Sequence, residues 1–387
     1  MQRTRAILKR RNGIIGLLAV AALAVTLVAT GCGGGGDSGT TGTTATTSTT
    51  STTSTTSTTS TTSTTSTTST TSTTSTTATT SGNLPQNVIF YTIPDISSTE
   101  FRHIDPDGTG DTLFATLPAN VAGVGLNAAN PNQTVFAYRA DATSQYGIYR
   151  NDTIDIAGAT QIVAPSYDFV DSLQVSTNGQ FVYYVGTQGT NDSLYKISIN
   201  GGAAPTILVN GAVTHAHVNQ AGSQIVYAQV QSNNRAAVFV RSTDNTGSST
   251  QLTQFFGTTG YDADYPQFSK DSTKVVFSAD RNSANGTYDL WTVASVGGNL
   301  QQVTNTQSRD ELGASFNNDG TAVSYVVIDI VPSQSGIYRT SATATDVSTT
   351  LLKASSAVGN STYWTSQNGR ARGIGALVLD RRRHERP

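Results

Sequence analysis

The sequence predicts an all-β fold: a six-bladed β-propeller with a split closing blade, preceded by a disordered Thr/Ser tether. Three observations predict it. A pattern of short, alternating strands recurs about every 48 residues. A long Gly/Thr/Ser-rich segment precedes the repeats, and no amphipathic helix of ordinary length follows residue 84. The 387 residues therefore divide into a lipoprotein signal peptide (1–31), a linker (32–83), a propeller (84–380) and a basic tail (381–387).

The first segment has the features of a bacterial export signal. Basic residues from Arg3 to Arg11 precede an apolar run from Ile14 to Ala29, which is shorter than the ~20 residues of a membrane-spanning helix. The run ends just before Cys32, the only cysteine, in small residues that resemble the bacterial lipobox. The resemblance implies cleavage before Cys32 and lipid modification of its thiol. A stray, unmodified thiol is the alternative.

The linker is almost entirely Gly, Thr and Ser, with Ser-Thr-Thr repeated many times. Such a segment cannot bury enough apolar area to offset the entropy of ordering, so we expect it to be disordered. As a flexible coil it would span roughly 35–40 Å between the lipid anchor and the folded domain. These features predict a location in the bacterial cell envelope, lipid-anchored and facing the periplasm or the cell surface.

The charge of the propeller segment restricts its partners. Acidic side chains outnumber basic ones between residues 84 and 380, and only the tail is basic. This balance argues against nucleic acid or an anionic membrane surface as the main partner of the folded domain. We therefore expect contact with the membrane only through the lipid on Cys32, and we interpret the tail as a solvated end.

Five segments share one repeat: a bulky residue, a turn, then an alternating apolar strand that ends in an aromatic residue. They are 175–184, 218–227, 268–277, 316–325 and, less clearly, 129–138. Each is followed by a strand that contains an aromatic residue and by a last short strand. Asn, Asp and Gly at the turns predict hairpins between them.

The N-terminal unit lacks the first strand of the repeat. It begins at Val88, whereas a partial copy of the missing strand stands near the C-terminus at residues 362–370. One blade split between the two ends would close the ring and pair edges that are otherwise exposed. Five complete blades and one split blade make six.

Residues 262–327 resemble the repeat of TolB-type β-propellers. The matching features are Tyr265-Pro266 before the first turn, the turn at 268–271, the strand at 289–291, Gly297-Gly298, and the Val303-Thr304 ending. The resemblance implies a six-bladed propeller. The α/β domain that precedes the propeller in TolB itself is replaced here by the linker, so no role in the Tol system is implied.

Propellers commonly bind ligands where loops gather around the central axis. The loops expected to enter each first strand carry a set of charged and imidazole side chains that should share one face near the channel mouth: Asp168, Asp171, His215, His217, Asp262, Asp264, Arg309, Asp310 and Glu311. They could bind Ca²⁺, a basic peptide or a sugar. The alternative is structural, with each Asp accepting hydrogen bonds from turn amides.

His215 and His217 are spaced by two on a predicted strand, so both rings should face the same side, a geometry that can serve a metal. The TolB-type resemblance includes polysaccharide lyases with a histidine-rich metal site. Such a site needs more histidines, and the propeller segment offers only His103 elsewhere. Residues 105–111 also resemble a calcium loop, but they lack the spacing and the final Glu of an EF-hand, and a plain hairpin is favoured.

No nucleophile motif stands in the propeller segment. We therefore expect no enzymatic activity, no cofactor and no dedicated metal. The predicted function is that of an envelope-anchored binding or scaffolding lipoprotein whose propeller loops bind a protein, peptide or glycan. The alternative is a metal-dependent, carbohydrate-active enzyme that uses the channel mouth. A propeller stabilised by Ca²⁺ is a third possibility.

Overall fold

A computed structural model describes residues 88–94, 98–130, 133–152, 154–253, 262–280, 287–298, 300–306, 308–329, 331–343, 349–354 and 363–364. The predictions for the signal segment, Cys32, the linker and the basic tail lie outside these residues. Within them, the only helix is the short 3₁₀ helix η1 (Pro332–Gln334), and no helix is long and apolar enough to cross a membrane.

The fold is all-β, as predicted, and consists of six four-stranded antiparallel sheets. We number these sheets as blades 1 to 6. Blade 1 contains β24 (Tyr363–Trp364), β1 (Ile89–Pro94), β2 (Ser98–Ile104) and β3 (Thr112–Pro118). Blade 2 contains β4 (Val121–Leu126), β5 (Thr134–Tyr138), β6 (Tyr146–Asn151) and β7 (Thr160–Tyr167). Blade 3 contains β8 (Phe169–Val175), β9 (Phe181–Gln188), β10 (Asn191–Ser198) and β11 (Thr206–Val209).

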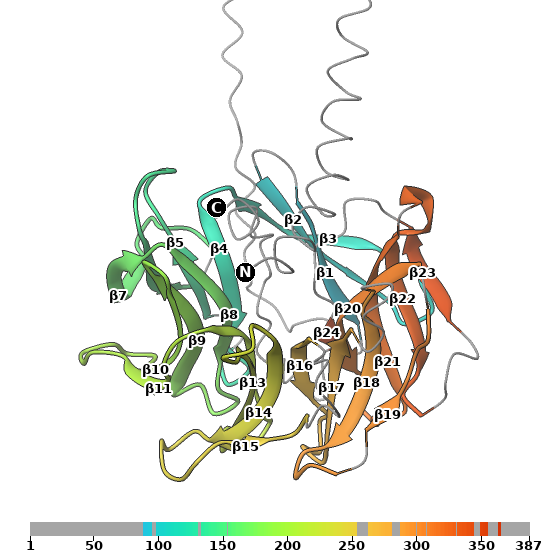
Figure 1. The fold of residues 1–387 in the computed structure, drawn as a ribbon. Helices are drawn as coiled ribbons and strands as arrows, with labels where there is room; N and C mark the ends of the chain where they lie inside the picture. The colour runs from blue at the N-terminus through green and yellow to red at the C-terminus, as the bar shows by residue number, and fades with distance from the viewer. Residues whose placement is uncertain are drawn as a thin grey trace, which may run out of the picture. The chain divides into compact units, whose positions relative to one another are not determined.

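The other three blades follow in chain order around the ring (Figure 1). Blade 4 contains β12 (Val213–Val218), β13 (Gln224–Val230), β14 (Ala236–Ser242) and β15 (Thr250–Gln251). Blade 5 contains β16 (Ala263–Phe268), β17 (Lys274–Ala279), β18 (Asp289–Ala294) and β19 (Gln301–Gln302). Blade 6 contains β20 (Arg309–Phe316), β21 (Ala322–Asp329), β22 (Gly336–Ser341) and β23 (Thr350–Ala354).

The split closing blade is confirmed. β24 pairs antiparallel with β1, with Trp364 opposite Ile89 and Tyr363 opposite Phe90. The first strand of blade 1 therefore comes from the C-terminal part of the chain, whereas its other three strands come from the start of the described residues. The first strands of successive blades contact one another and line the inside of the ring (Figure 1).

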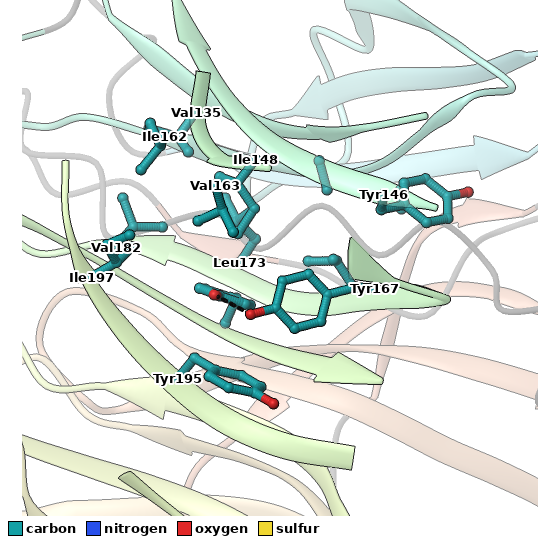
Figure 2. Close-up of a cluster of buried hydrophobic side chains, with 14 of the residues drawn as sticks. Val135, Tyr146, Ile148, Ile162, Val163, Tyr167, Leu173, Val182, Tyr195 and Ile197 are labelled. Atoms are coloured by element: carbon teal, nitrogen blue, oxygen red, sulfur yellow. Dashed lines mark hydrogen bonds between the residues drawn. The ribbon is translucent and has the colours of Figure 1, made fainter. Parts of the chain in front are cut away.

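The hydrophobic core is divided among the six junctions between neighbouring blades. Each of six clusters of buried side chains draws its residues from two adjacent blades, and the two clusters that include β1 join blade 1 to blade 2 and to blade 6. The cluster between blades 2 and 3 contains Tyr146 and Tyr167 from one blade and Tyr195 from the other (Figure 2). The ring is thus held together mainly by the apolar side chains that pack between neighbouring blades.

The middle strand β9 shows how the sequence produces this arrangement. Successive side chains of a strand point to opposite faces of the sheet. Tyr184 therefore packs toward blade 2, where its hydroxyl lies 2.8 Å from that of Tyr167, whereas Tyr183 packs toward blade 4. Both tyrosines are almost fully buried, and burying such a side chain contributes about 1.5–3 kcal/mol. The apolar run of β9 reflects burial on both faces.

The segment at 105–111 forms the hairpin between β2 and β3. The amide of Asp105 donates to the Thr109 carbonyl over 2.9 Å, and the Asp107 carboxylate accepts hydrogen bonds from the amide and the hydroxyl of Thr109. These contacts are those of a turn stabilised by its own Asp side chain. The hairpin that the sequence favoured over a calcium loop is confirmed.

A partly buried polar cluster joins blades 6 and 1 beside this hairpin. Asp111 accepts hydrogen bonds from the Tyr91 hydroxyl and from Arg102 Nε, and Lys353 Nζ of β23 donates to its other oxygen over 2.6 Å. Burial alone would raise the pKa of Asp111, but the bonds from Lys353, Tyr91 and Arg102 outweigh it and lower the pKa to about 2. Lys353 thus links the last complete blade to the split one.

We predict that Asp111→Asn weakens the closure of the ring. Three donors would lose a charged acceptor, so the free energy of unfolding should fall by about 1.5–3 kcal/mol. Because folding lowers the pKa of Asp111, its contribution is complete above pH ~4 and is lost as the pH falls toward 2. Urea titrations between pH 2 and 7 would measure both effects. Asp107→Asn, which changes an exposed carboxylate of the same hairpin, is the control and should cost less than half as much.

Candidate functional site

Most of the residues predicted to form the site lie in the first half of the first strands or directly before them, whereas His217 lies near the end of β12. Asp171 is in β8, His215 and His217 are in β12, Asp264 is in β16, and Arg309, Asp310 and Glu311 begin β20. Asp168 and Asp262 directly precede β8 and β16. The expectation that all of them occupy loops is thus corrected, because strand pairing reaches further toward the start of each repeat than the turn residues suggested.

A bulge or register shift interrupts each of these first strands. The register shifts between Asp171 and Gln174 in β8 and between Asp264 and Gln267 in β16, and β4, β12 and β20 have similar shifts. A bulge adds a residue to one strand and turns the neighbouring side chains to a new direction. The bulge therefore changes the direction in which the acidic side chains beside it point.

Two bulges hold a non-glycine residue in the left-handed backbone region. Ser172 has a φ of 50° and Tyr265 a φ of 55°, and each directly follows an aspartate. The Asp171 carboxylate accepts the amide of Ser172, and Asp264 Oδ1 accepts the amide of Tyr265 over 2.8 Å. This backbone region is unfavourable for residues other than glycine. The hydrogen bonds from the two amides to the aspartates offset this conformational cost, and they also hold the aspartate side chains in place.

Asp171, His215 and Asp264 come together from three successive blades, and we call them the inner-strand triad. His215 Nδ1 lies 2.8 Å from Asp264 Oδ1, and His215 Nε2 lies 3.5 Å from Asp171 Oδ2. The Thr214 hydroxyl also donates to Asp264 Oδ1 over 2.7 Å. The ring of Tyr265 lies against that of His215, with centroids 4.0 Å apart. An imidazole between two carboxylates thus links blades 3, 4 and 5.

The triad is recessed but retains access to solvent. The exposed fractions of the side chains are 7% for Asp171, 12% for His215 and 17% for Asp264. Burial alone would raise the pKa of Asp264, but the charge of His215 and hydrogen bonds from His215, Thr214 and Tyr265 outweigh it and lower the pKa. The triad therefore presents acidic groups, beside an aromatic ring, at the inner strands.

His217 belongs to a different set of contacts. Its Nδ1 accepts the amide of Phe268 in the next blade over 3.3 Å. Gln174, at the corresponding position of blade 3, accepts the amide of Val218 over 3.0 Å and donates to the Ala216 carbonyl over 2.6 Å. His217 is 3% exposed. It therefore ties neighbouring first strands together, as Gln174 does.

The two histidines both contact β16, in agreement with the prediction that their rings face the same side. They engage different groups there, because His215 pairs with Asp264 whereas His217 binds the backbone of Phe268. Within the described ranges, no three or more His, Cys, Asp or Glu residues are placed to hold a metal ion. The metal-dependent alternative stays a hypothesis without a converging ligand set among these residues.

Asp168, Asp262 and Asp310 have structural partners, as the alternative interpretation predicts. Asp262 accepts the Ala236 amide and pairs with Arg235, both in the preceding blade. The other two follow the same principle: Asp310 accepts the Tyr288 amide of the preceding blade, and Asp168 accepts the Gly189 amide and the side chain of Gln145. Ligand binding by these three residues stays a prediction.

Glu311 is fully buried at the junction of blades 5 and 6. Its Oε1 accepts hydrogen bonds from Arg309 Nε and from the Thr306 hydroxyl, both over 3.2 Å, whereas its Oε2 has no hydrogen-bond partner. The Arg309 guanidinium also lies over the ring of Tyr338, 5.2 Å from its centroid. Burial raises the pKa of Glu311 to about 7.

Two residues that matter here were not predicted from the sequence. Tyr265 entered only as part of the repeat, and nothing in a repeat predicts that its ring will lie on a histidine of the preceding blade. Gln174 was missed although a signal existed: Gln174, His217 and Gln267 each stand one position before the bulky residue that ends a first strand. A polar residue recurring at a buried position predicts a repeated structural contact.

The architecture is that of a six-bladed β-propeller, and its fold is similar to that of TolB proteins. TolB from Acinetobacter baumannii matches with a TM-score of 0.51 at 14% identity, over 66% of this chain and 61% of that one, so the chain spans less than two thirds of that protein. A TolB from Agrobacterium tumefaciens matches with a TM-score of 0.52 at 12% identity, over 75% of this chain and 97% of that one.

A weaker likeness, with a TM-score of 0.44 at 13% identity, joins the chain to an oligogalacturonate lyase from Vibrio parahaemolyticus over 66% of this chain and 71% of that one. No protein-family profile and no curated protein matches the sequence. At these identities, the likeness to TolB establishes the propeller fold and leaves the function to be argued from the residues.

We predict that His217→Gln preserves the stability of the propeller, because glutamine already fills the corresponding position in blade 3. His217→Leu should instead lower the free energy of unfolding by about 1–3 kcal/mol, since the Phe268 amide would be buried without an acceptor. Equilibrium urea unfolding of the two variants would measure the difference. Equal losses in both would contradict the structural role assigned to the His217 ring.

Proposed function

We propose that this protein is a non-catalytic binding or scaffolding lipoprotein of the bacterial envelope, and that its inner-strand triad forms part of the surface that binds a partner. The observation that carries the proposal is the pairing of Asp171, His215 and Asp264 across three blades with partial exposure. Most other charged residues predicted for the site are engaged in contacts within the ring.

Two properties support a binding role. First, the triad lies on strands held by buried clusters on both sides, so its groups are fixed before a partner arrives, which lowers the entropic cost of binding. Second, carboxylates beside a tyrosine suit a partner that offers cationic and flat apolar groups, such as Lys or Arg side chains of a protein or peptide. A glycan could use the same surface through its hydroxyl groups.

The envelope location rests on the sequence. The export signal, the lipobox-like residues before Cys32 and the linker that follows are the features of an anchored protein. The linker would let the propeller reach partners tens of ångströms from the membrane.

A site-specific cross-linking experiment tests the binding surface. Tyr265 would be replaced by p-benzoylphenylalanine in the full chain, produced in cells that carry the protein naturally, and cells would be irradiated before isolation. We expect a discrete cross-linked partner, because the ring lies at the triad. The matched control places the same group at Val296, which is 84% exposed on the same blade in the turn between β18 and β19.

The outcomes are distinct. A partner captured at residue 265 and absent at residue 296 supports the proposed surface, and its recovery should fall at least about tenfold when Asp171→Asn and Asp264→Asn are added, as the loss of charge-assisted contacts implies. Equal capture at both positions, or none at either, would contradict binding at the triad.

Lipid anchoring has a separate test. We expect the full chain to incorporate an alkyne-bearing fatty acid and to fractionate with membranes, whereas Cys32→Ser should incorporate none and lose its membrane association. The reason is that a thioether at Cys32 can form only on its sulfur. Labelling of Cys32→Ser at the level of the unchanged chain would refute the anchor and leave the test of the triad intact.

A further inference from the structure

The feature that carries this inference is a pocket of about 260 Å³ between blades 3 and 4. Blade 3 contributes the start of β9, the end of β10, the turn that follows and β11, and blade 4 contributes the turn after β14, residues 243–245. The register pairs Val175 with Val182 and Asp171 with Val185. Phe181, which lines the pocket, therefore stands at the end of the strands away from the inner-strand triad. The pocket is a separate site, and the proposed binding function does not depend on it.

A lysine without a counter-ion lines this pocket. Lys196 Nζ lies over the ring of Phe181, 4.1 Å from its centroid, and donates one hydrogen bond, to the Thr243 carbonyl over 2.9 Å. An ammonium group has three N–H donors, so the other two find no acceptor among the described residues. Within the same residues Lys196 forms no ion pair. Burial lowers its pKa, although the charge of Asp244 opposes this. A partly buried cation without a paired carboxylate favours the binding of an anion.

A second cation contacts the wall of the pocket. The Arg241 guanidinium donates to the Leu208 carbonyl and, over 2.8 Å, to Asn245 Oδ1, and both acceptors belong to lining residues. Arg241 also forms no ion pair in the part of the chain that the structure describes. Asp244 is the only acidic residue among the described residues of the lining, and its Oδ1 accepts the amide and the hydroxyl of Thr246 in its own turn. Two cations and one carboxylate leave a net charge of +1 at the pocket.

We propose that this pocket binds a small ligand through a single carboxylate, with the carboxylate on Lys196 and the neutral part of the ligand beside Thr206 and Asn245. The net charge matches a monoanion, and a contact between ammonium and carboxylate is charge-assisted. The Thr206 hydroxyl and the Asn245 side-chain nitrogen make no hydrogen bond to the described residues, so both are available to hydroxyl or amide groups of a ligand.

The size of the pocket restricts the ligand further. Its volume is slightly below the ~300–1,000 Å³ of ordinary ligand pockets, so it suits a molecule of about one sugar ring or one amino acid. A carboxylate on such a body occurs in acidic sugars and in acylated amino acids. These two sources share the recognised chemistry, and the experiment separates them.

The test titrates the purified full chain with sodium glucuronate and with N-acetylalanine, and follows binding by saturation-transfer difference NMR. At least one of the two should bind with a Kd of about 10⁻³ M, as the size of the ligand implies, whereas uncharged glucose should show no saturable binding. Binding of glucuronate alone assigns the pocket to acidic sugars, and binding of N-acetylalanine alone assigns it to acylated amino acids. Binding of both shows that the carboxylate is the recognised group.

Variants locate the binding. Lys196→Met removes the charge, keeps the length of the side chain and should weaken binding at least about tenfold. Lys274→Met, which removes an exposed lysine from β17, is the matched control and should bind as the unchanged chain does. Ala204→Phe, which fills the pocket and leaves Lys196 in place, is the second variant if Lys196→Met does not fold.

Three results would overturn the proposal: no saturable binding of either acid, equal binding by Lys196→Met and the unchanged chain, or binding of glucose as tight as that of glucuronate. None of them changes the expectation for cross-linking at residue 265, so failure of this pocket and failure of the triad are distinguishable.

Discussion

The packing of apolar side chains between adjacent blades is the interaction on which the rest of the structure depends. Each blade has apolar side chains on both faces, as the alternation of Tyr183 and Tyr184 shows, so no blade can bury its surface alone. In an open row of such sheets, the two end blades would each leave an apolar face exposed, whereas a closed ring leaves none. The clusters that β1 shares with blade 2 and with blade 6 complete that ring.

The polar residues at the inner strands are best understood through the same constraint. Where blades meet along apolar faces, the backbone groups at the strand ends and along the first strands still need hydrogen-bond partners. Side chains of the neighbouring blade supply those partners. Gln174 and His217 do this along the first strands, and Asp262 and Asp310 do it at their beginnings. The inner-strand triad differs because its carboxylates bind a titratable ring and keep some exposure. That difference separates a surface available to a partner from residues that hold the ring together.

Much of the fold could be predicted from the sequence because its causes are local and repeated. The turn within each repeat, the alternation of the strands and the displaced strand β24 each have a signal in single repeats. The site was predicted less completely. The spacing of His215 and His217 suggested a common role. Their roles differ because His215 meets the carboxylate of Asp264, whereas His217 meets the backbone amide of Phe268 in the next blade. A bulge that re-aims Asp171 or Asp264 also depends on pairing geometry, which no single repeat reveals.

The partnership of β24 with β1 has a consequence for how the molecule is made. The inner edge of β1 is paired only after Tyr363 and Trp364, which come far later in the sequence, have been made. Contacts of such long sequence separation form slowly and leave apolar faces exposed in the meantime. Until Tyr363 and Trp364 are in place, β1 presents an open edge to any extended chain nearby. A chain stalled or clipped short of them would therefore be released as an incomplete ring, prone to join with others of its kind.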